Sequence, residues 1–321
     1  MGMKQSKDAV APSSHSLTDI EGILVGHHTL RGRRTGCTVV TARFPMVAGV
    51  DVRGGAPGTR ETDLLRPENT VPGIHAVFIS GGSAFGLDVG GGVAGFLEEQ
   101  GYGFRVGEVA VPVVCGAILF DLQHGDPKIR PDARAGYEAA RKASGAPVPE
   151  GSVGAGAGCT VGKLFGPERA MKGGIGSWSW RRADGLAVGA LVAVNCAGDV
   201  RDPDRGNIVA GARESDGGGF IDSMEQIRSG RRLDLRFGGN TVVGVVATNA
   251  TLDKAACTVV ARMAHDGLAR CIYPAHTPLD GDTIFALATG RHATPCDAIN
   301  VAIIGAMAAD VVARAVVRGC R

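Results

Sequence analysis

The sequence predicts a mixed α/β protein in which helices cover β-sheets. The first observation is that short apolar runs of buried-strand length alternate with amphipathic helical stretches and glycine-bearing turns. The second is the glycine content, 50 of 321 residues, which is about twice the usual share. The third is that aromatic residues make up only 5% of the chain. A core rich in Gly, Ala and Val but poor in aromatic rings predicts closely packed backbones and tight turns.

Length, charge and hydrophobicity exclude several classes of protein. At roughly 150 residues per domain, the 321 residues make one large domain or two small ones. Hydrophobic residues are 44% and charged residues 21%, as in a globular chain rather than a disordered one. The net charge is only +2 and the one tight basic cluster is Arg31–Arg34, so we expect no nucleic-acid partner. No apolar run reaches about 18 residues without a charge or a glycine, so we expect no membrane partner.

The cysteines and the amino-terminal stretch indicate a cytoplasmic protein. Eight cysteines are scattered along the chain without a C-x-x-C pair, and we expect reduced, mostly buried thiols rather than disulfides or a zinc site. His27 and His28 have no carboxylate at ligand spacing, so no metal is expected there either. Met1–Ser16 is polar and lacks the apolar core of a secretory signal.

The first half of the chain begins with a tail that we expect to be disordered over residues 1–17. Cys37–Ala42 is β-branched and predicts a strand. Asp51–Leu65 is a polar glycine loop, which suits special backbone angles or a close backbone approach. Ile74–Ser80 predicts a buried strand. It leads into a helix predicted over 83–100, with a serine N-cap at its start and a glycine after its end.

Three consecutive glycines, Gly90–Gly92, interrupt this predicted helix. Each costs about 1 kcal/mol relative to alanine in a helix interior. We therefore expect a compensating gain, and tight contact between the helix and the sheet is the simplest one.

The second half alternates strands and helices around one polar stretch. Arg201–Gly239 is charged, glycine-rich and poor in apolar residues, and predicts a long mobile linker. The other expected elements are a short helix over Pro131–Ser144, buried strands over Leu186–Asn195, Thr241–Thr248 and Thr283–Thr289, an amphipathic helix over Leu252–Leu268, and a final helix from an Asp297 cap to about Gly319.

The junction between the predicted linker and the strand that follows is a candidate self-cleavage site. Gly238, Gly239 and Asn240 run directly into Thr241, a hydroxyl residue that opens a β-branched strand. The hydroxyl of Thr241 can attack the preceding carbonyl and give an ester that water hydrolyses. The new amino-terminal threonine would then hold both a nucleophile and a base, because an α-amine has a pKa of about 7.7–8.0. An ordinary turn before a strand remains the alternative on this pattern alone.

Several long stretches, all in one order, resemble the self-processing aminopeptidases of the P1 or S58 family. This family contains L-aminopeptidase/D-Ala-esterase/amidases, β-peptidyl aminopeptidases and nylon-oligomer (6-aminohexanoate) endo-hydrolases. The Asn-Thr junction and the Asp-Gly-Asp loop resemble the nylon-hydrolase branch more than the serine branch. The matching stretches are His75–Asp88, Gly154–Lys163, Lys172–Ser177, Ala193–Asn195, Gly239–Thr241, Met263–Arg270 and His276–Phe285.

The resemblance implies an α+β fold, a four-layer αββα sandwich like that of N-terminal-nucleophile-like aminopeptidases and ornithine acetyltransferases. It implies one catalytic domain over 18–321, cut into an α chain ending at residue 240 and a β chain of 241–321. The implied substrate is an amide of a short peptide, β-peptide or ω-amino acid oligomer. No metal or organic cofactor is implied, and a homo-oligomer of αβ units, tetrameric or larger, is expected.

The resemblance also assigns roles to single residues. Thr241 would be the nucleophile, released by cleavage after Asn240. Lys163 would favour the neutral form of the Thr241 amine. The side-chain amide of Asn195 would donate to a developing oxyanion. Two carboxylates would hold the amine or the lysine, or bind an amino group of the substrate, and they are Asp280 and Asp282, which share one face of an extended chain.

One departure concerns the wall of the substrate pocket. Members of the family often carry a tyrosine where this chain has Phe120, so a phenol that could assist the oxyanion is missing. The glycine-rich turn Gly81, Gly82 and Ser83 is expected to line the pocket together with Phe120.

Without the resemblance, each of these residues has a plainer interpretation. Lys163 would be a solvated lysine and Asn195 a turn former. Asp280-Gly-Asp282 would be a turn or a calcium-like loop. His265 beside Asp266 suggests a Ser/His/Asp arrangement, but a histidine near a helix end more often bonds the last carbonyls.

Three other functions compete with the aminopeptidase interpretation. Gly81–Gly86 follows a strand and opens a helix, as a phosphate-binding turn does, but it lacks the G-x-G-x-x-G spacing. A self-cleaving acyltransferase of the ornithine acetyltransferase type would share the threonine chemistry. A ligand-binding protein that is never cleaved would fit the loss of the tyrosine at Phe120.

Overall fold

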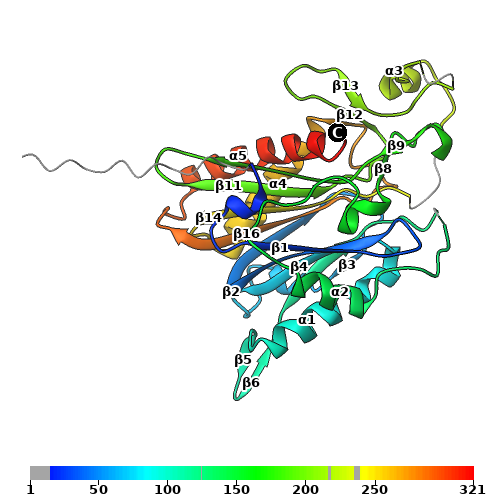
Figure 1. Cartoon of the computed structure of the whole chain (residues 1–321). Coiled ribbons are helices and arrows are strands. Elements are labelled where there is room, and N and C mark those ends of the chain that lie inside the picture. Colours follow the sequence, from blue (N-terminus) through cyan, green and yellow to red (C-terminus); the bar gives the residue numbers. More distant parts are fainter. Residues whose placement is uncertain (1–14, 124, 216–217, 235–238) are drawn as a thin grey trace, which may run out of the picture.

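The computed structural model describes residues 15–123, 125–215, 218–234 and 239–321. Two β-sheets lie face to face, and helices cover their outer faces (Figure 1). The first sheet holds β1 (Leu24–Thr29), β4 (Ile74–Ser80), β7 (Val114–Ile118) and the short β3 (Thr59–Arg60). The second holds β10 (Ile175–Arg181), β11 (Ala187–Ala193), β14 (Val243–Ala250) and β16 (Thr283–His292).

One long strand, β2 (Gly36–Val52), joins the two sheets. Its first part pairs with β1 and β4, and its register with β4 shifts between Thr41 and Met46. Its last part, Val47–Val52, pairs antiparallel with β16. The strand order is therefore β10-β11-β14-β16-β2-β4-β7-β3, in which β14 and β16 run parallel, as do β4 and β7.

Three buried apolar clusters fill the three spaces between four layers. Helices α1 (Val89–Glu99) and α2 (Ala133–Arg141) pack on the first sheet, and α4 (Lys254–Ala269) and α5 (Ala298–Arg318) pack on the second. A third cluster lies between the sheets. In β14, Val245 belongs to the cluster between the sheets and Val246 to the one under α4 and α5, because successive side chains of a strand point to opposite faces. The expected αββα sandwich is confirmed.

Helix α5 has 21 residues and is the one described helix whose length and apolar composition would also suit a membrane span. Half of its apolar window is buried inside the protein, against β10, β11 and α4. Its side-chain carboxylate cap at Asp297 accepts a hydrogen bond from the backbone of Asn300, as the sequence predicts.

Two of the three consecutive glycines of α1 allow close packing, one against the sheet and one against another helix. A β-carbon on Gly90 would lie 2.8 Å from the Phe78 ring on β4, which is the expected contact between helix and sheet. A β-carbon on Gly92 would collide with the Ala133 carbonyl of α2, so this glycine serves a contact between helices instead. Gly91 meets nothing within 4 Å.

The mobile linker predicted over Arg201–Gly239 is wrong for the residues described there. The segment contains β13 (Ile208–Ala210) and α3 (Ser223–Arg228), and β13 pairs with β12 (Asp199–Arg201) beyond the end of α5 (Figure 1). The buried carboxylate of Asp199 accepts hydrogen bonds from the backbone of Ala212 and Ser223. Side-chain to backbone bonds therefore order a segment that has few apolar residues.

Three other expectations need correction. Ser83 does not cap the α-helix; it opens a 3-10 turn, η3 (Ser83–Asp88), with a positive φ of 55°. β2 extends ten residues beyond the predicted Ala42, because it bends from one sheet into the other. His15 stacks on Trp178 and Leu17 is fully buried, so the described end of the expected 1–17 tail belongs to the fold; residues 1–14 lie outside the described residues.

The remaining short elements are η1 (Leu17–Asp19), η2 (Asp63–Leu65), β5 (Phe104–Val106), β6 (Val109–Val111), η4 (Gly154–Gly158), β8 (Thr160–Val161), η5 (Pro167–Arg169), β9 (Met171–Lys172) and β15 (Ile272–Tyr273).

Candidate active site

The junction between Asn240 and Thr241 lies buried where the chain enters β14. Thr241 is 4% exposed and Asn240 is 2% exposed. The backbone N–H of Thr241 donates to the carbonyl of Asn195 at 2.9 Å. The carbonyl of Asn240 accepts two hydrogen bonds, from the hydroxyl of Thr241 at 2.5 Å and from the backbone N–H of Gly281 at 3.2 Å. The hydroxyl is therefore held against the carbonyl group that precedes it.

A glycine-rich wall closes around this junction. A β-carbon on Gly281 would lie 2.8 Å from the Thr241 hydroxyl oxygen, so only glycine leaves room for the hydroxyl there. The loop over 51–65 lies against the same turn. Gly54 abuts the backbone of Asp280, and the N–H of Ala56 donates to the Asp280 carbonyl at 2.8 Å. The close backbone approach expected of this loop is confirmed.

Lys163 is buried beside the junction and is ringed by oxygen atoms. Its Nζ donates to the carbonyl of Gly239 at 2.7 Å, to the carbonyl of Asn195 at 3.1 Å and to the side-chain Oδ1 of Asn195 at 2.9 Å. Burial lowers the pKa of Lys163 to about 8, because the charged form loses its hydration. No ion pair joins Lys163 to a carboxylate among the described residues.

Asn195 follows β11 and connects the lysine to the rest of the site. Its Oδ1 accepts from Lys163 and from the backbone N–H of Thr160, and its Nδ2 donates to the carbonyl of Phe120 at 3.2 Å. The amide donor predicted to meet an oxyanion is thus engaged by Phe120 in the intact chain. Phe120 takes part through its backbone, which does not depend on the missing phenol.

The two carboxylates lie on either side of the turn that contacts the junction. Asp280 is 3% exposed, and its Oδ2 accepts from the backbone N–H of Thr277 at 2.7 Å. Burial raises the pKa of Asp280, and the charge of Asp282 adds to the effect. Asp282 is 2% exposed, and its Oδ1 accepts from the backbone N–H of Val242 at 2.8 Å, one residue after the nucleophile.

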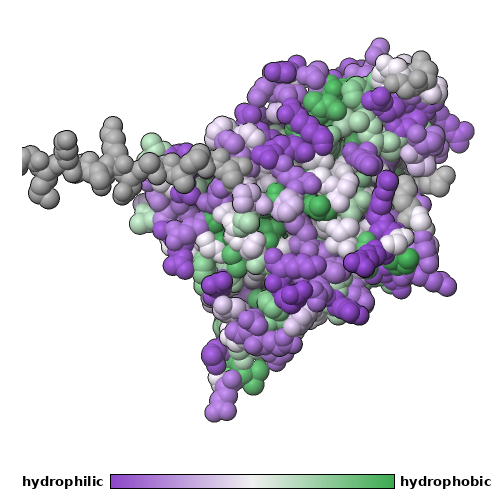
Figure 2. Space-filling view, viewed as in Figure 1, coloured by the Kyte–Doolittle hydropathy of each residue, from purple (hydrophilic) through white to green (hydrophobic). Residues whose placement is uncertain are grey.

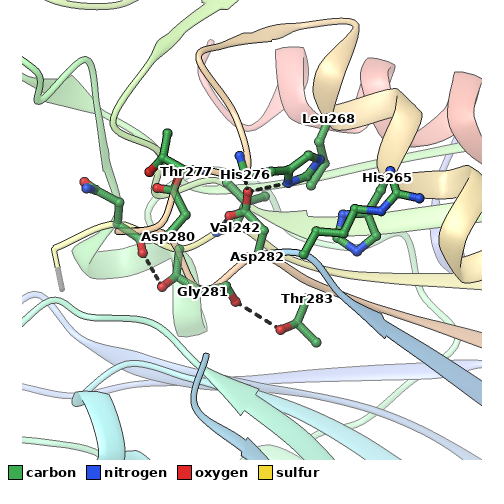
Figure 3. A network of polar contacts seen from close by, with 12 residues as sticks. Val242, His265, Leu268, His276, Thr277, Asp280, Gly281, Asp282 and Thr283 are labelled. Atoms are coloured by element: carbon green, nitrogen blue, oxygen red, sulfur yellow. Dashed lines mark hydrogen bonds and ion pairs between the residues drawn. The ribbon is translucent and has the colours of Figure 1, made fainter. Parts of the chain in front are cut away.

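Asp282 contacts His276, a residue to which the sequence assigned no role, and His276 in turn contacts His265 (Figure 3). His276 donates to Asp282 Oδ2 from its backbone at 3.1 Å, and its ring Nδ1 lies 2.8 Å from the same oxygen. Its ring meets that of His265 edge to face, with centroids 4.9 Å apart. The only signal in the sequence is that His276 opens the stretch that ends at Asp282, and Pro278 can turn that stretch back on itself.

His265 bonds a carbonyl, as the plainer interpretation expected, but not one of its own helix. Its Nε2 lies 3.0 Å from the backbone oxygen of Asp51 on β2. Burial lowers the pKa of His265 to about 4, so its ring is neutral near pH 7. The structure therefore gives no support for a Ser/His/Asp arrangement at His265.

The turn Gly81, Gly82 and Ser83 gathers around Asp121 rather than around Thr241. The N–H of Gly82 donates to the Asp121 carboxylate at 2.9 Å, and a β-carbon on Gly81 would collide with it. The N–H of Ser83 donates to the carbonyl of Leu119. The turn therefore bonds the two residues that flank Phe120 in the sequence. It is not part of the lining of the cavity of about 620 Å³ that opens beside Thr160.

The arrangement suits acyl transfer by protein groups. The Thr241 hydroxyl, the buried Lys163, Asn195 and the Asp282 carboxylate all bond to the junction or to residues next to it. Asp280 belongs to the turn that contacts this junction. Within the described residues, no group of three or more His, Cys, Asp or Glu side chains is placed to hold a metal ion.

Comparison with solved structures places the fold. The L-aminopeptidase D-Ala-esterase/amidase of Ochrobactrum anthropi, described as a new variant of the Ntn hydrolase fold, superposes with a TM-score of 0.70 at 19% identity, over 95% of this chain and 85% of that one. The protein thus has the fold of an N-terminal-nucleophile hydrolase.

The sequence comparisons then give the family. The model of Peptidase family S58 matches residues 15–320, and the chain belongs to this family. An uncharacterized aminopeptidase of Mycobacterium tuberculosis is 43% identical over 95% of this chain and 93% of its own length. A 6-aminohexanoate-oligomer endohydrolase of Kocuria sp. is 28% identical over 94% and 85%. The protein is therefore a hydrolase that acts on peptide or amide bonds.

Proposed function

We propose that the chain cuts itself between Asn240 and Thr241 and then works as an N-terminal-threonine amidohydrolase or aminopeptidase. The observation that carries this proposal is the 2.5 Å contact between the Thr241 hydroxyl and the Asn240 carbonyl oxygen. The hydroxyl needs little movement to reach the adjacent carbonyl carbon.

In the processing step, the Thr241 oxygen bonds to the Asn240 carbonyl carbon and its proton passes to the Thr241 nitrogen. The C–N bond then breaks and leaves an ester, which water hydrolyses to the Asn240 carboxylate and a free Thr241 amine. The Gly281 N–H already donates to the Asn240 oxygen and is placed to stabilise the charge that develops there. Lys163 orients the segment from the other side through Gly239.

In turnover, the same hydroxyl attacks the carbonyl carbon of the substrate amide. The Thr241 α-amine takes the hydroxyl proton and passes it to the leaving amine, and water then hydrolyses the ester. An α-amine has an ordinary pKa of about 7.7–8.0, and a neighbouring Lys163 ammonium would lower it further. Asp282, which bonds the N–H of Val242, would hold the new terminus in place.

The proposed substrate is an amide at the amino end of a short peptide, a β-peptide or a 6-aminohexanoate oligomer. The Kocuria relative is named for the last of these. The buried carboxylates Asp280 and Asp282 suit a substrate ammonium group. We propose that the enzyme works without metal or organic cofactor, since protein groups supply nucleophile, base and donors.

We also propose a cytoplasmic homo-oligomer of αβ units, with a tetramer expected. The hairpin of β5 and β6 supports an intersubunit contact, because it exposes Val106 (61%) and Val109 (58%). Figure 2 shows hydrophobic atoms near the protruding end of this hairpin.

The first test is the intact mass of purified protein under denaturing conditions. Wild-type protein of 32.8 kDa should give fragments of about 24 and 8 kDa, the shares of residues 1–240 and 241–321. Thr241→Ala should stay a single chain and lose all hydrolysis of aminoacyl p-nitroanilides. Thr241→Ser, which keeps a hydroxyl, is the matched control and should still be cut. A stable single wild-type chain, or a Thr241→Ala variant with wild-type activity, would contradict the proposal.

A further inference from the structure

We propose that the cavity beside Thr160 is a carboxylate-binding subsite, in which Arg34 and Lys172 hold the acid end of the substrate's leaving group. This inference rests on the proposed function and narrows its substrate class. The preferred substrates become short amides with a free carboxylate on the far side of the bond that is cut.

The cavity adjoins the reacting groups through Thr160. Its volume is about 620 Å³, and Thr160 forms part of its wall. The N–H of Thr160 donates to Asn195 Oδ1, and the carbonyl of Asn195 accepts from the N–H of Thr241. One residue therefore separates the cavity wall from the nucleophile along this chain of hydrogen bonds. A volume of several hundred Å³ is typical of small-molecule sites and has room for an amino acid leaving group.

The charge of the cavity is positive. Its lining contains Arg33, Arg34 and Lys172, and no acidic side chain is among the described lining residues. Arg33 is buried and already neutralised by Asp121, 2.7 Å away. Arg34 and Lys172 are exposed, and neither forms an ion pair within the described part of the chain. Two cations that form no ion pair with the described residues, in a concave wall, favour an anionic ligand.

The β8–β9 hairpin aims Lys172 at the same side as Thr160. The two residues are direct partners in this antiparallel pair, so their side chains leave the same face of the hairpin. Both line the cavity, while Arg34 approaches it from the loop before β2. The two cations thus come from separate parts of the chain and meet across one space.

The opposite charges of the site give the substrate a direction. The carboxylates Asp280 and Asp282 belong to the turn that contacts the Asn240–Thr241 junction, whereas Arg34 and Lys172 lie beyond Asn195. A short zwitterionic amide can set its ammonium end toward the carboxylates and its carboxylate end into the cavity. Arginine and lysine also bind phosphate, so a general anion site is the alternative that the test must separate.

The experiment compares the linear dimer of 6-aminohexanoate with its carboxamide. Wild-type enzyme should cleave the acid with a kcat/KM at least about tenfold above that of the amide, mainly through KM, as expected when the carboxylate forms charge-assisted contacts. In Arg34→Gln and Lys172→Gln this ratio should fall toward one. Arg31→Gln is the matched control, because Arg31 is exposed on the same loop but does not line the cavity, and it should keep the wild-type ratio.

An equal kcat/KM for acid and amide in the wild type, or an equal loss in the Arg31→Gln control, would overturn the subsite. A second experiment, calorimetric titration with 6-acetamidohexanoate, tests the subsite separately from the proposed function.

If the probe binds the wild type but not Arg34→Gln, and no amide is cleaved, the subsite is supported and the hydrolase mechanism is refuted. If the probe does not bind but the chain still cuts itself normally, the subsite is refuted and the proposed mechanism stands. Inorganic phosphate that displaces the probe equally well would show a general anion site and contradict the carboxylate assignment.

Discussion

Lys163 is buried, and its ammonium group bonds three oxygen atoms of the protein in place of water. Burial lowers its pKa to about 8, so the ammonium form that grips Gly239 is lost when the pH rises through this value. In the uncut precursor Thr241 has no free amine, so the titration of Lys163 can be followed without that of the amine.

Self-processing of the precursor should therefore slow as the pH rises above about 8. The measurement is the rate of fragment appearance, by intact mass, in freshly synthesised chain incubated from pH 6 to 10. Lys163→Arg is the matched variant, because a guanidinium stays protonated over this range. If the Lys163→Arg variant cuts itself, its rate of self-cleavage should not fall above pH 8. A wild-type rate that stays level from pH 7 to 10 would show that the lysine charge plays no part.

His276 is a positioning residue for Asp282, because its ring Nδ1 lies against the Asp282 carboxylate. Its backbone has a positive φ of 57°, which limits the substitutions that keep the local conformation. Both asparagine and glycine tolerate this backbone region. His276→Asn keeps a side-chain donor for Asp282, whereas His276→Gly removes it and keeps the backbone.

We expect His276→Gly to lower kcat by about tenfold or more, since Asp282 loses a charge-assisted hydrogen bond. His276→Asn should recover most of that loss, while KM changes little in either variant. Steady-state kinetics and the pH profile of kcat are the readouts. Equal kcat values for the two variants would assign His276 a purely structural role.

At the scale of the element, α1 shows how backbone proximity overrides helix propensity. Three adjacent glycines weaken this helix, but they are not equivalent in the folded chain. Gly92 lets the α2 backbone approach, Gly90 accommodates Phe78, and Gly91 faces open space.

Gly91→Ala should raise the free energy of unfolding by up to about 1 kcal/mol, because alanine is the better helix former and nothing is displaced. Gly92→Ala should lower it, since the added methyl would collide with Ala133 of α2. The measurement is thermal unfolding of both variants in the Thr241→Ala background, in which we expect no self-cleavage to complicate the unfolding curve. The two variants should shift the stability in opposite directions. Equal effects of both substitutions would refute the packing argument.

At the scale of the whole molecule, the junction lies where cleavage leaves the sandwich intact. The 241–321 segment supplies β14 and β16 to the middle of the second sheet. There β14 pairs with β11, and β16 pairs with β2, both from the 1–240 segment. Its helices α4 and α5 cover the same sheet.

The two chains should therefore remain together after cleavage. Native mass spectrometry should detect αβ units and their expected tetramer, while denaturing conditions should release both chains. Val106→Lys with Val109→Lys should weaken the tetramer without separating α from β if the β5–β6 hairpin is an intersubunit contact. Release of the β chain on native size exclusion would show that the sheet does not hold it.

Local patterns predicted the regular elements well where one physical cause dominated. The bounds of β4 were predicted without error, because Ile74–Ser80 is a continuous apolar run with a glycine turn after it. Predictions were wrong where long-range contacts decided. The N–H of Ser83, in the 3-10 turn, donates to the carbonyl of Leu119, and the buried carboxylate of Asp199 binds the backbone of Ala212 and Ser223 in the described part of the 201–239 region.

By itself, the sequence determined the mixed α/β class, most helices and strands, and the candidate nucleophile at the Asn240–Thr241 junction, since these depend on periodicity, caps and residues adjacent in the chain. The family resemblance added the remaining candidate residues. Other contacts could be known only from the folded chain. Lys163 bonds Gly239, the carbonyl of Phe120 accepts from Asn195, and His276 lies against Asp282. Arg34 and Lys172 line one cavity. These contacts join distant segments, and their distances follow from how the two sheets and their loops pack.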